Sequence, residues 1–453
     1  MLRSIASLSL LAAAAIAQSP FTFGNVLVVR VGDGLAALTN ASTAVFLDEY
    51  SPTGTLVQSI PLPTAATGAN QPFTCSGTST SEGFLNLSDN GLYLTLAGYG
   101  TAPGLTSVAA TLAAATPRVI GRVDLNGTID TSTALSDAYS GGNIRSAVST
   151  DGSVFWTTGS NGGVRFTTLG ATTTVGINAG APSNVRVSGL YNGQLYTTSS
   201  STGYYSVCSV GTGIPTVGPA TISVLSGLPT TQGPSAYDFW FADPATLYIA
   251  DDRPLLSNGG IQKYVLTGGV WNLQYTLAPS GTLGCRGLSG QKVNGVTTVW
   301  ATTGPALVSV VDAGVGSVVT TIASAPANTA FRGVRRLAKP TTLQRLPASC
   351  GTAGIVATGT AEIGTDVITT IQNPAGFAFV GYGISALGVP FCNCTVLHEF
   401  SFLVGAAQHA LSLPNNPALF GYQLLVQGLD FLAPGGCPDP LFTLTDGYSF
   451  SIQ

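Results

Sequence analysis

The middle of the chain repeats one pattern, in which a polar turn precedes a short apolar run that carries an aromatic residue. Period-two alternation over such short runs predicts β-strands, and Asn-Gly or Asp-Gly turns between them predict hairpins. The aromatic residues that mark these runs follow one another at spacings of 63, 40, 52 and 52 residues. They are Tyr93, Trp156, Tyr196, Tyr248 and Trp300.

Each marked run has one apolar segment before it and two more strands after it, as in "KYVLTGGVWNLQYTL" and "VSVVDAGVGSVVTTI". A four-stranded unit that recurs every 40–50 residues or so is typical of a β-propeller blade. Residues 25–63 supply three further strands and residues 330–338 supply one. Pairing these two ends would close a ring of six blades and remove exposed sheet edges. A seventh blade within residues 63–80 or 100–118 is the alternative.

The two ends of the chain follow other patterns. Residues 1–17 combine a positive charge at Arg3 with an apolar run and small residues before Gln18, which predicts a secretory signal peptide. The propeller would then occupy residues 18–340, followed by a linker at 341–353. Residues 354–453 contain many short alternating runs, which predict a small β-sandwich. We therefore expect an all-β protein that is secreted or at the cell surface, without a transmembrane segment after signal cleavage.

Cysteine placement separates the two predicted domains. Four cysteines fall in or just before the sandwich, and an exported domain with four cysteines is expected to form two disulfides, with three pairings open. Two of them, only two residues apart, are expected on one face of a strand. The three remaining cysteines lie in the propeller, where their odd number leaves at least one thiol free or bonded outside it. The four are Cys350, Cys392, Cys394 and Cys437, and the three are Cys75, Cys208 and Cys285.

Composition excludes some partners. Only 8% of the residues are charged, against roughly 25% in ordinary soluble domains. The net charge is −4, and no run of Lys or Arg exists to neutralise phosphates, which argues against nucleic-acid binding. The expected partner is a cell-surface or extracellular polymer or protein, bound by a monomer.

The apolar segment before each aromatic marker would be the innermost strand of its blade, and these strands line the channel of a propeller. Five such segments precede the markers, and residues 330–338 form the sixth. Charged residues stand at corresponding positions of all six segments, where a charged fraction of 8% would place about half a residue by chance. They are Glu82, Arg145, Arg186, Asp238, Arg286 and Arg332. One interpretation is structural, because buried charges between blades must be paired. The other is a net positive funnel in which Arg captures an anionic group.

Acids also cluster in "DPATLYIADD", where Asp243 begins the stretch and Asp251 and Asp252 end it. Short acidic side chains in turns accept hydrogen bonds from backbone N–H groups, and this is the favoured interpretation. A calcium site at these three residues is the weaker alternative, and calcium is the only cofactor that the sequence suggests.

Catalytic signals are sparse. The chain has two histidines, His398 and His409, both in the predicted sandwich, and His398 is expected to be a surface residue of a strand. No nucleophile elbow, zinc-protease or phosphate-loop motif occurs. The sequence favours a non-catalytic recognition or scaffold protein. The alternative is a secreted hydrolase or lyase acting on a polysaccharide or lactone through paired channel carboxylates such as Glu82 and Asp238, with calcium as a candidate cofactor.

Three resemblances agree with this organisation. The string "LYIADD…GGIQKYVL" is similar to blades of secreted NHL- and YVTN-type propellers. The strings "FLDEYSPTGTLVQSIPLP", "SGGNIRSAVSTDG" and "NTAFRGV" resemble secreted bacterial propeller proteins without an assigned reaction. The strings "AFVGYGISALGVPFCNCTVL" and "LTDGYSFSI" resemble a terminal domain of planctomycete-type secreted proteins. The resemblance to the terminal domain implies a role for the sandwich in surface attachment or sorting.

Overall fold

The computed structural model describes residues 19–178, 180–231, 233–293, 295–339, 343–419, 421–434, 437–438 and 441–452. The expected signal peptide lies outside these residues. The described chain consists of β-strands and short 3-10 helices at Val108–Ala110, Leu255–Ser257 and Pro417–Leu419. None of its helices has the length and apolar character needed to cross a membrane.

Four antiparallel four-stranded sheets follow one another from residue 144 to residue 324. Their strands run in chain order across each sheet, as repeated hairpins require. The first holds β9 (Ile144–Val148), β10 (Val154–Gly159), β11 (Val164–Thr168) and β12 (Val175–Gly176). The second holds β13 (Ser188–Tyr191), β14 (Gln194–Thr198), β15 (Val207–Val210) and β16 (Ile222–Val224). The third holds β17 (Ala236–Asp243), β18 (Thr246–Asp251), β19 (Gly260–Thr267) and β20 (Val270–Leu277). The fourth holds β21 (Gly287–Val293), β22 (Val296–Thr302), β23 (Ala306–Asp312) and β24 (Thr320–Ser324).

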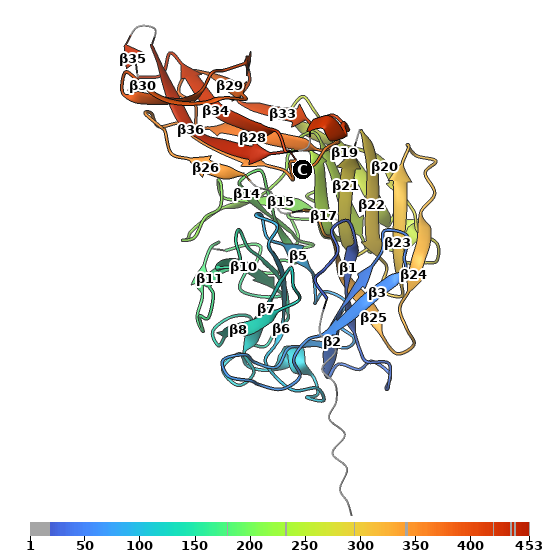
Figure 1. The fold of residues 1–453 in the computed structure, drawn as a ribbon. Helices are drawn as coiled ribbons and strands as arrows, with labels where there is room; N and C mark the ends of the chain where they lie inside the picture. The colour runs from blue at the N-terminus through green and yellow to red at the C-terminus, as the bar shows by residue number, and fades with distance from the viewer. Residues whose placement is uncertain are drawn as a thin grey trace, which may run out of the picture.

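A nine-stranded sheet joins the two ends of this region. One half is β25 (Ala330–Arg336), β1 (Val26–Val31), β2 (Ser42–Tyr50) and β3 (Leu56–Pro61). The other half is β5 (Asn86–Leu87), β6 (Tyr93–Tyr99), β7 (Arg118–Asp124) and β8 (Ile129–Leu135). The short β4 (Thr74–Ser76) pairs with both β2 and β6 and so connects the halves. Figure 1 shows the sheets arranged around a common centre, which is consistent with a β-propeller.

The predicted markers and the predicted pairing of the chain ends can be located in these sheets. Four of the five aromatic residues lie on the second strand of a four-stranded sheet, namely β10, β14, β18 and β22, and Tyr93 lies on β6, the second strand of its half of the nine-stranded sheet. Strand β25 pairs antiparallel with β1, and Val26 lies opposite Arg336. The strand after the last repeat therefore contacts the first strand of the chain.

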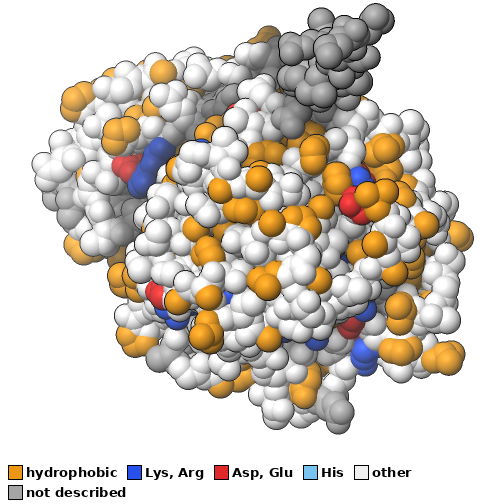
Figure 2. Space-filling model, turned by 90° about the horizontal axis from the view of Figure 1, so that it is seen from below, with side chains coloured by type: hydrophobic (Ala, Val, Ile, Leu, Met, Phe, Trp, Pro, Cys, Tyr) orange, Lys and Arg blue, Asp and Glu red, His pale blue; other side chains and the backbone are white. Residues whose placement is uncertain are grey.

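The surface carries few charges. Figure 2 shows a face on which uncharged polar side chains and backbone predominate, with small apolar areas and isolated charged groups between them. This appearance follows from a chain in which only 8% of the residues are charged. A surface of this kind interacts with ligands through hydrogen bonds and packing more than through a long-range electrostatic field.

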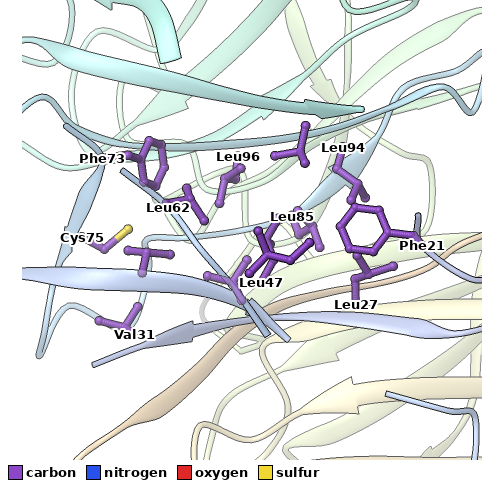
Figure 3. Packing of buried hydrophobic residues seen from close by; sticks show 14 of the residues in the cluster. Phe21, Leu27, Val31, Leu47, Leu62, Phe73, Cys75, Leu85, Leu94 and Leu96 are labelled. Carbon is purple, nitrogen blue, oxygen red and sulfur yellow. The ribbon is translucent and has the colours of Figure 1, made fainter. Parts of the chain in front are cut away.

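Apolar side chains fill the space between neighbouring sheets. Figure 3 shows one such cluster between the two halves of the nine-stranded sheet, where Leu47 of β2 lies near Leu94 and Leu96 of β6. Phe73, beside β4, belongs to the same cluster and is fully buried. Burial of a side chain of this size contributes about 1.5–3 kcal/mol. The sheets are therefore held face to face by their alternating apolar residues.

The residues after β25 form separate sheets. The largest holds β26 (Gln344–Leu346), β36 (Leu441–Ser451), β34 (Gln423–Phe431), β29 (Phe377–Gly383) and β32 (Phe402–Val404), with β35 (Cys437–Pro438) paired to β36. A second sheet holds β27 (Gly354–Thr358), β28 (Asp366–Gln372) and β33 (Gln408–Ser412). Both sheets contribute to one apolar core, as in a sandwich. A third is the hairpin of β30 (Ala386–Phe391) and β31 (Cys394–His398). Strand β26 lies within the segment expected to be a linker.

The structure partly determines the cysteine pairing. Cys350 and Cys394 form a disulfide, and Cys392 is disulfide-bonded as well. Cys392 lies in the turn between β30 and β31 with a φ of 53°, so the expectation that Cys392 and Cys394 share a strand face is wrong. The side chain of Cys437 lies outside the described residues. In the propeller part, Cys75, Cys208 and Cys285 are buried free thiols, and burial raises the pKa of each.

The C-terminal sheets contact one end of the ring. The Asn192 amide, in the turn between β13 and β14, donates to the Thr370 hydroxyl of β28 at 2.6 Å and accepts from it at 2.8 Å. Figure 1 shows the orange and red C-terminal strands beside β14, β15 and β17. This contact places the loop between β27 and β28 close to the ends of the inner strands.

Candidate functional site

The six predicted channel residues all lie within the first three residues of an inner strand or at most four residues before it. Glu82 precedes β5 and is fully buried. Its carboxylate accepts hydrogen bonds from the Tyr99 hydroxyl at 2.6 Å, from the Ser76 N–H at 2.8 Å and from the Asn143 amide of the next sheet. Burial raises the pKa of Glu82, and these donors oppose that rise. Glu82 therefore links two sheets and offers no surface to a substrate.

Two of the predicted arginines reach across to the following sheet. Arg145 donates through Nη1 to the Val185 carbonyl at 2.9 Å. Arg186 donates through Nη1 to the Ala236 carbonyl at 2.8 Å. These bonds satisfy carbonyl groups that strand pairing leaves free, as the structural interpretation of the charged ring expects.

The other two arginines also have protein partners. Arg286 forms an ion pair between its Nε and Asp252 Oδ2 at 3.1 Å. Arg332 donates through Nη2 to the Gly77 carbonyl at 2.9 Å, while its buried Nε has no hydrogen-bond partner among the described residues. Each arginine therefore has one or two acceptors that hold its position, and further N–H groups for which the described part of the chain shows no acceptor.

Two of the four arginines lie over one aromatic ring, that of Tyr237, and the other two lie within electrostatic range of it. The guanidinium carbon of Arg186 lies 3.9 Å from the centre of the Tyr237 ring, and that of Arg286 lies 5.9 Å from it. Burial lowers the pKa of Arg145 to about 10, and the charge of Arg186 adds to the effect. Burial also lowers the pKa of Arg332, and Arg286 adds to it. We call this group, Arg145, Arg186, Arg286 and Arg332 around Tyr237, the arginine cluster.

Asp238 belongs to a different network, through a residue that the sequence analysis missed. Its fully buried carboxylate forms a bidentate ion pair with Arg335, in which Nη1 donates to Oδ2 at 2.7 Å and Nη2 donates to Oδ1 at 3.0 Å. Arg335 also donates to Asn86 Oδ1 at 2.8 Å and to the Leu288 carbonyl. These partners come from β5, β17 and β21, so one guanidinium joins four inner strands. The only signal in the sequence was that the strand of Arg332 carries two further arginines, Arg335 and Arg336.

The three calcium candidates are engaged by cations and backbone donors. Asp243 forms an ion pair with Lys292 at 2.6 Å, and Asp251 forms one with Arg253 at 2.7 Å. Asp252 is the partner of Arg286, as described above. Asp243 also accepts from the Ala245 N–H at 2.8 Å, as expected for an acid that stabilises a turn. No group of three His, Cys, Asp or Glu side chains within the described ranges is arranged to hold a metal ion.

His398 is buried, so its expected position on the surface is wrong. It ends β31 and lies against Gly383 of β29, where an added Cβ would be 2.6 Å from Nδ1. That nitrogen accepts a hydrogen bond from the Phe400 N–H at 3.2 Å, and Nε2 has no partner in the described part of the chain. The β30–β31 hairpin packs on the larger sheet, so the face of β31 that carries His398 points toward that sheet and not toward solvent. Burial lowers the pKa of His398 to about 4.

This histidine should make the protein less stable in mild acid. The folded-state pKa of His398 lies below its ordinary value of 6.5. Between these two values the imidazole is protonated in the unfolded chain and neutral in the folded chain, so stability falls as pH drops below about 6.5. We expect a loss of about 2 kcal/mol in the free energy of unfolding between about pH 7 and about pH 4.5. The measurement is urea unfolding of wild type and His398→Asn, whose amide oxygen can still accept from Phe400. Equal pH dependence in the two proteins would contradict the prediction.

A pocket of about 330 Å³ lies at the opposite ends of the inner strands, where the β27–β28 loop covers them. Its lining includes Tyr191 and Trp240 from the propeller part, and Thr358 and Glu362 from the C-terminal part. Sequence reasoning did not find it, because its walls come from segments more than 100 residues apart that only folding brings together. The arginine cluster and this pocket are therefore separate candidate sites.

Comparisons with known proteins show only distant likeness. No family model and no curated protein matches the chain. A GH74 enzyme of Niastella koreensis is 14% identical with a TM-score of 0.38, over 79% of this chain and 59% of the enzyme. A gluconolactonase of Xanthomonas campestris is 10% identical with a TM-score of 0.36, over 60% of this chain and 89% of that one. The dihydro-heme d1 dehydrogenase NirN is 10% identical with a TM-score of 0.33, over 80% and 71%.

The chain thus spans less than two thirds of the length of the GH74 enzyme. The three similar structures are enzymes, but TM-scores and identities this low transfer no activity to this chain.

Proposed function

We propose that this protein is a recognition protein that acts outside the cytoplasm and captures an anionic group at the arginine cluster. The carrying observation is that the guanidinium groups of Arg186 and Arg286 lie over the Tyr237 ring. The charge of Arg186 contributes to the lowered pKa of Arg145, and the charge of Arg286 contributes to that of Arg332, so the four groups lie close to one another. Glu82 and Asp252 are the acids beside them, so the cluster keeps a positive excess. Guanidinium N–H groups match carboxylate, phosphate and sulfate oxygens in geometry and charge.

The proposed architecture is a six-bladed ring. Its support is the set of four four-stranded sheets together with the two halves of the nine-stranded sheet, and the pairing of β25 with β1. Joining the first and last strands would hold the six inner strands at fixed positions around the channel. A fixed ring would keep the four arginines at constant separations, so that little entropy is lost when an anion binds.

We assign an attachment role to the C-terminal sheets. In β30 all six residues are exposed, and Leu387, Val389 and Phe391 are among them. Apolar residues exposed in a row are typical of surfaces that contact another molecule. The Cys350–Cys394 disulfide supports a location outside the cytoplasm, because such bonds persist in oxidising compartments.

A secreted hydrolase or lyase that acts on a polysaccharide or lactone is the second candidate. The channel carboxylates do not favour it, since Glu82 is enclosed and Asp238 is neutralised by Arg335. Asp89 favours this second candidate, because it lines the pocket, is solvent-exposed, and has a carboxyl whose pKa is raised by desolvation in the surrounding protein. A carboxyl of this kind is suited to general acid catalysis. Turnover of a polysaccharide or lactone that is lost in Asp89→Asn would establish this activity.

The anion site can be tested by calorimetry with phosphate, sulfate and citrate as probes. We expect at least one probe to bind, and Arg186→Ala to weaken that binding at least tenfold, because a charge-assisted hydrogen bond contributes about 1.5–3 kcal/mol. The melting temperature should change little. The control is Arg122→Ala, which removes an arginine paired with Asp130 on the outer strands. A marked loss of stability without an effect on any probe would assign the cluster a purely structural role.

A further inference from the structure

The pocket beneath the β27–β28 loop contains polar atoms that the fold leaves without partners. They are Tyr191 Oη, Thr358 Oγ1 and Arg336 Nε, all buried and without a hydrogen bond in the described part of the chain. Such groups are rare in folded proteins, because burying a polar atom without a hydrogen-bond partner is unfavourable. Three unpaired polar atoms around one cavity indicate a ligand-binding wall.

The pocket also holds acceptors that the protein does not use. The carboxylates of Asp89 and Glu362 accept no hydrogen bond among the described residues, and both line the pocket. Burial lowers the pKa of Arg336, and the nearby charge of Glu362 opposes that shift, yet the two side chains form no ion pair among the described residues. The pocket therefore presents acceptors at the acids and donors at Arg336, with hydroxyl groups that can do either.

Aromatic rings form much of the remaining wall. Tyr191 stacks on Phe241 with ring centres 4.5 Å apart, and Trp240 stacks on Tyr248 at 5.8 Å. Gly290 lies directly against the Trp240 ring, where any Cβ would overlap it. The rings are thereby held in place, and a ligand would meet a rigid apolar surface on one side and free polar groups on the other.

We propose that this pocket binds a neutral monosaccharide or disaccharide. A sugar hydroxyl donates and accepts at one atom, so a single ligand satisfies the carboxylates, the guanidinium and the hydroxyls together. The C–H groups of a sugar ring pack against aromatic side chains. The volume lies at the lower end of the roughly 300–1,000 Å³ range of small-molecule sites. An anionic ligand would be repelled by Asp89 and Glu362, which distinguishes this site from the arginine cluster.

Calorimetry on the full chain with glucose, galactose, cellobiose and maltose tests the proposal, with glycine and citrate as charged comparisons. We expect at least one sugar to bind, and Glu362→Gln and Arg336→Gln each to weaken it at least tenfold. Arg122→Gln, on an outer strand, is the matched control and should bind as wild type does. Trp240 provides a second readout, because sugar binding should change tryptophan fluorescence in wild type and not in Trp240→Phe.

Three results would overturn the proposal. One is that none of the four sugars produces heat or a fluorescence change at millimolar concentration. Another is binding that all pocket variants retain, with circular dichroism showing them folded. The third is binding of glycine or citrate that Glu362→Gln abolishes, without binding of any sugar. Loss of anion binding in Arg186→Ala with sugar binding intact would show that the two sites are independent.

Discussion

Replacement of Arg335 by methionine should lower the free energy of unfolding by about 3–5 kcal/mol, since it leaves a buried carboxylate without its cation. Asp238 is fully buried, and Arg335 is 13% exposed. The guanidinium also bonds to Asn86 and to the Leu288 carbonyl, so its loss frees groups on three other inner strands. The measurement is guanidinium chloride unfolding monitored by circular dichroism, with the midpoint and slope compared with wild type.

Two variants make this result interpretable. Arg122→Met breaks the Arg122–Asp130 pair, whose side chains are 22% and 29% exposed, and should cost less than about 1 kcal/mol. The double variant Asp238→Asn/Arg335→Met should be more stable than Arg335→Met alone, because an amide is cheaper to bury than an unpaired carboxylate. If Arg335→Met costs no more than Arg122→Met, the network does not hold the inner strands together.

The repeat was predictable because it depends on local rules. Alternation and turn residues place strands, so the aromatic markers at Tyr93, Trp156 and Tyr248 indicated the second strand of each sheet correctly. The pairing of residues 330–338 with the N-terminal strands followed from counting strands, and β25 does pair with β1. By contrast, β4 is three residues long and connects the two halves of the nine-stranded sheet, and no local sequence pattern indicates that connection.

The site was less predictable, since side-chain direction depends on register. The alignment placed Asp238 with the arginines, but its partner is Arg335, three residues beyond the arginine that had been selected. His398 was misplaced for a related reason, because alternation identifies two faces of a strand without saying which one is covered. The pocket depends on a contact between Asn192 and Thr370, 178 residues apart, which no pattern in either segment encodes.

Removal of the Cys350–Cys394 disulfide should destabilise the C-terminal sheets by about 4 kcal/mol, the chain-entropy value for a crosslink of this span. The bond closes a loop with a sequence separation of 44 and joins the segment before β27 to the start of β31. Cys394 is 3% exposed in a small apolar cluster with Phe442 and Leu444, so the bond also anchors the β30–β31 hairpin. The measurement is chemical unfolding of Cys350→Ala/Cys394→Ala under non-reducing conditions, followed by near-ultraviolet circular dichroism.

The control is Cys285→Ala, which removes a buried sulfur that has no crosslink. That variant should cost about 1 kcal/mol, the typical effect of a single substitution. The difference between the two variants isolates the crosslink from the loss of packing, because both remove sulfur atoms from apolar surroundings. If the double variant unfolds at the same denaturant concentration as Cys285→Ala, the sandwich core alone stabilises these sheets. The attachment role proposed for β30 would then not depend on an oxidising environment.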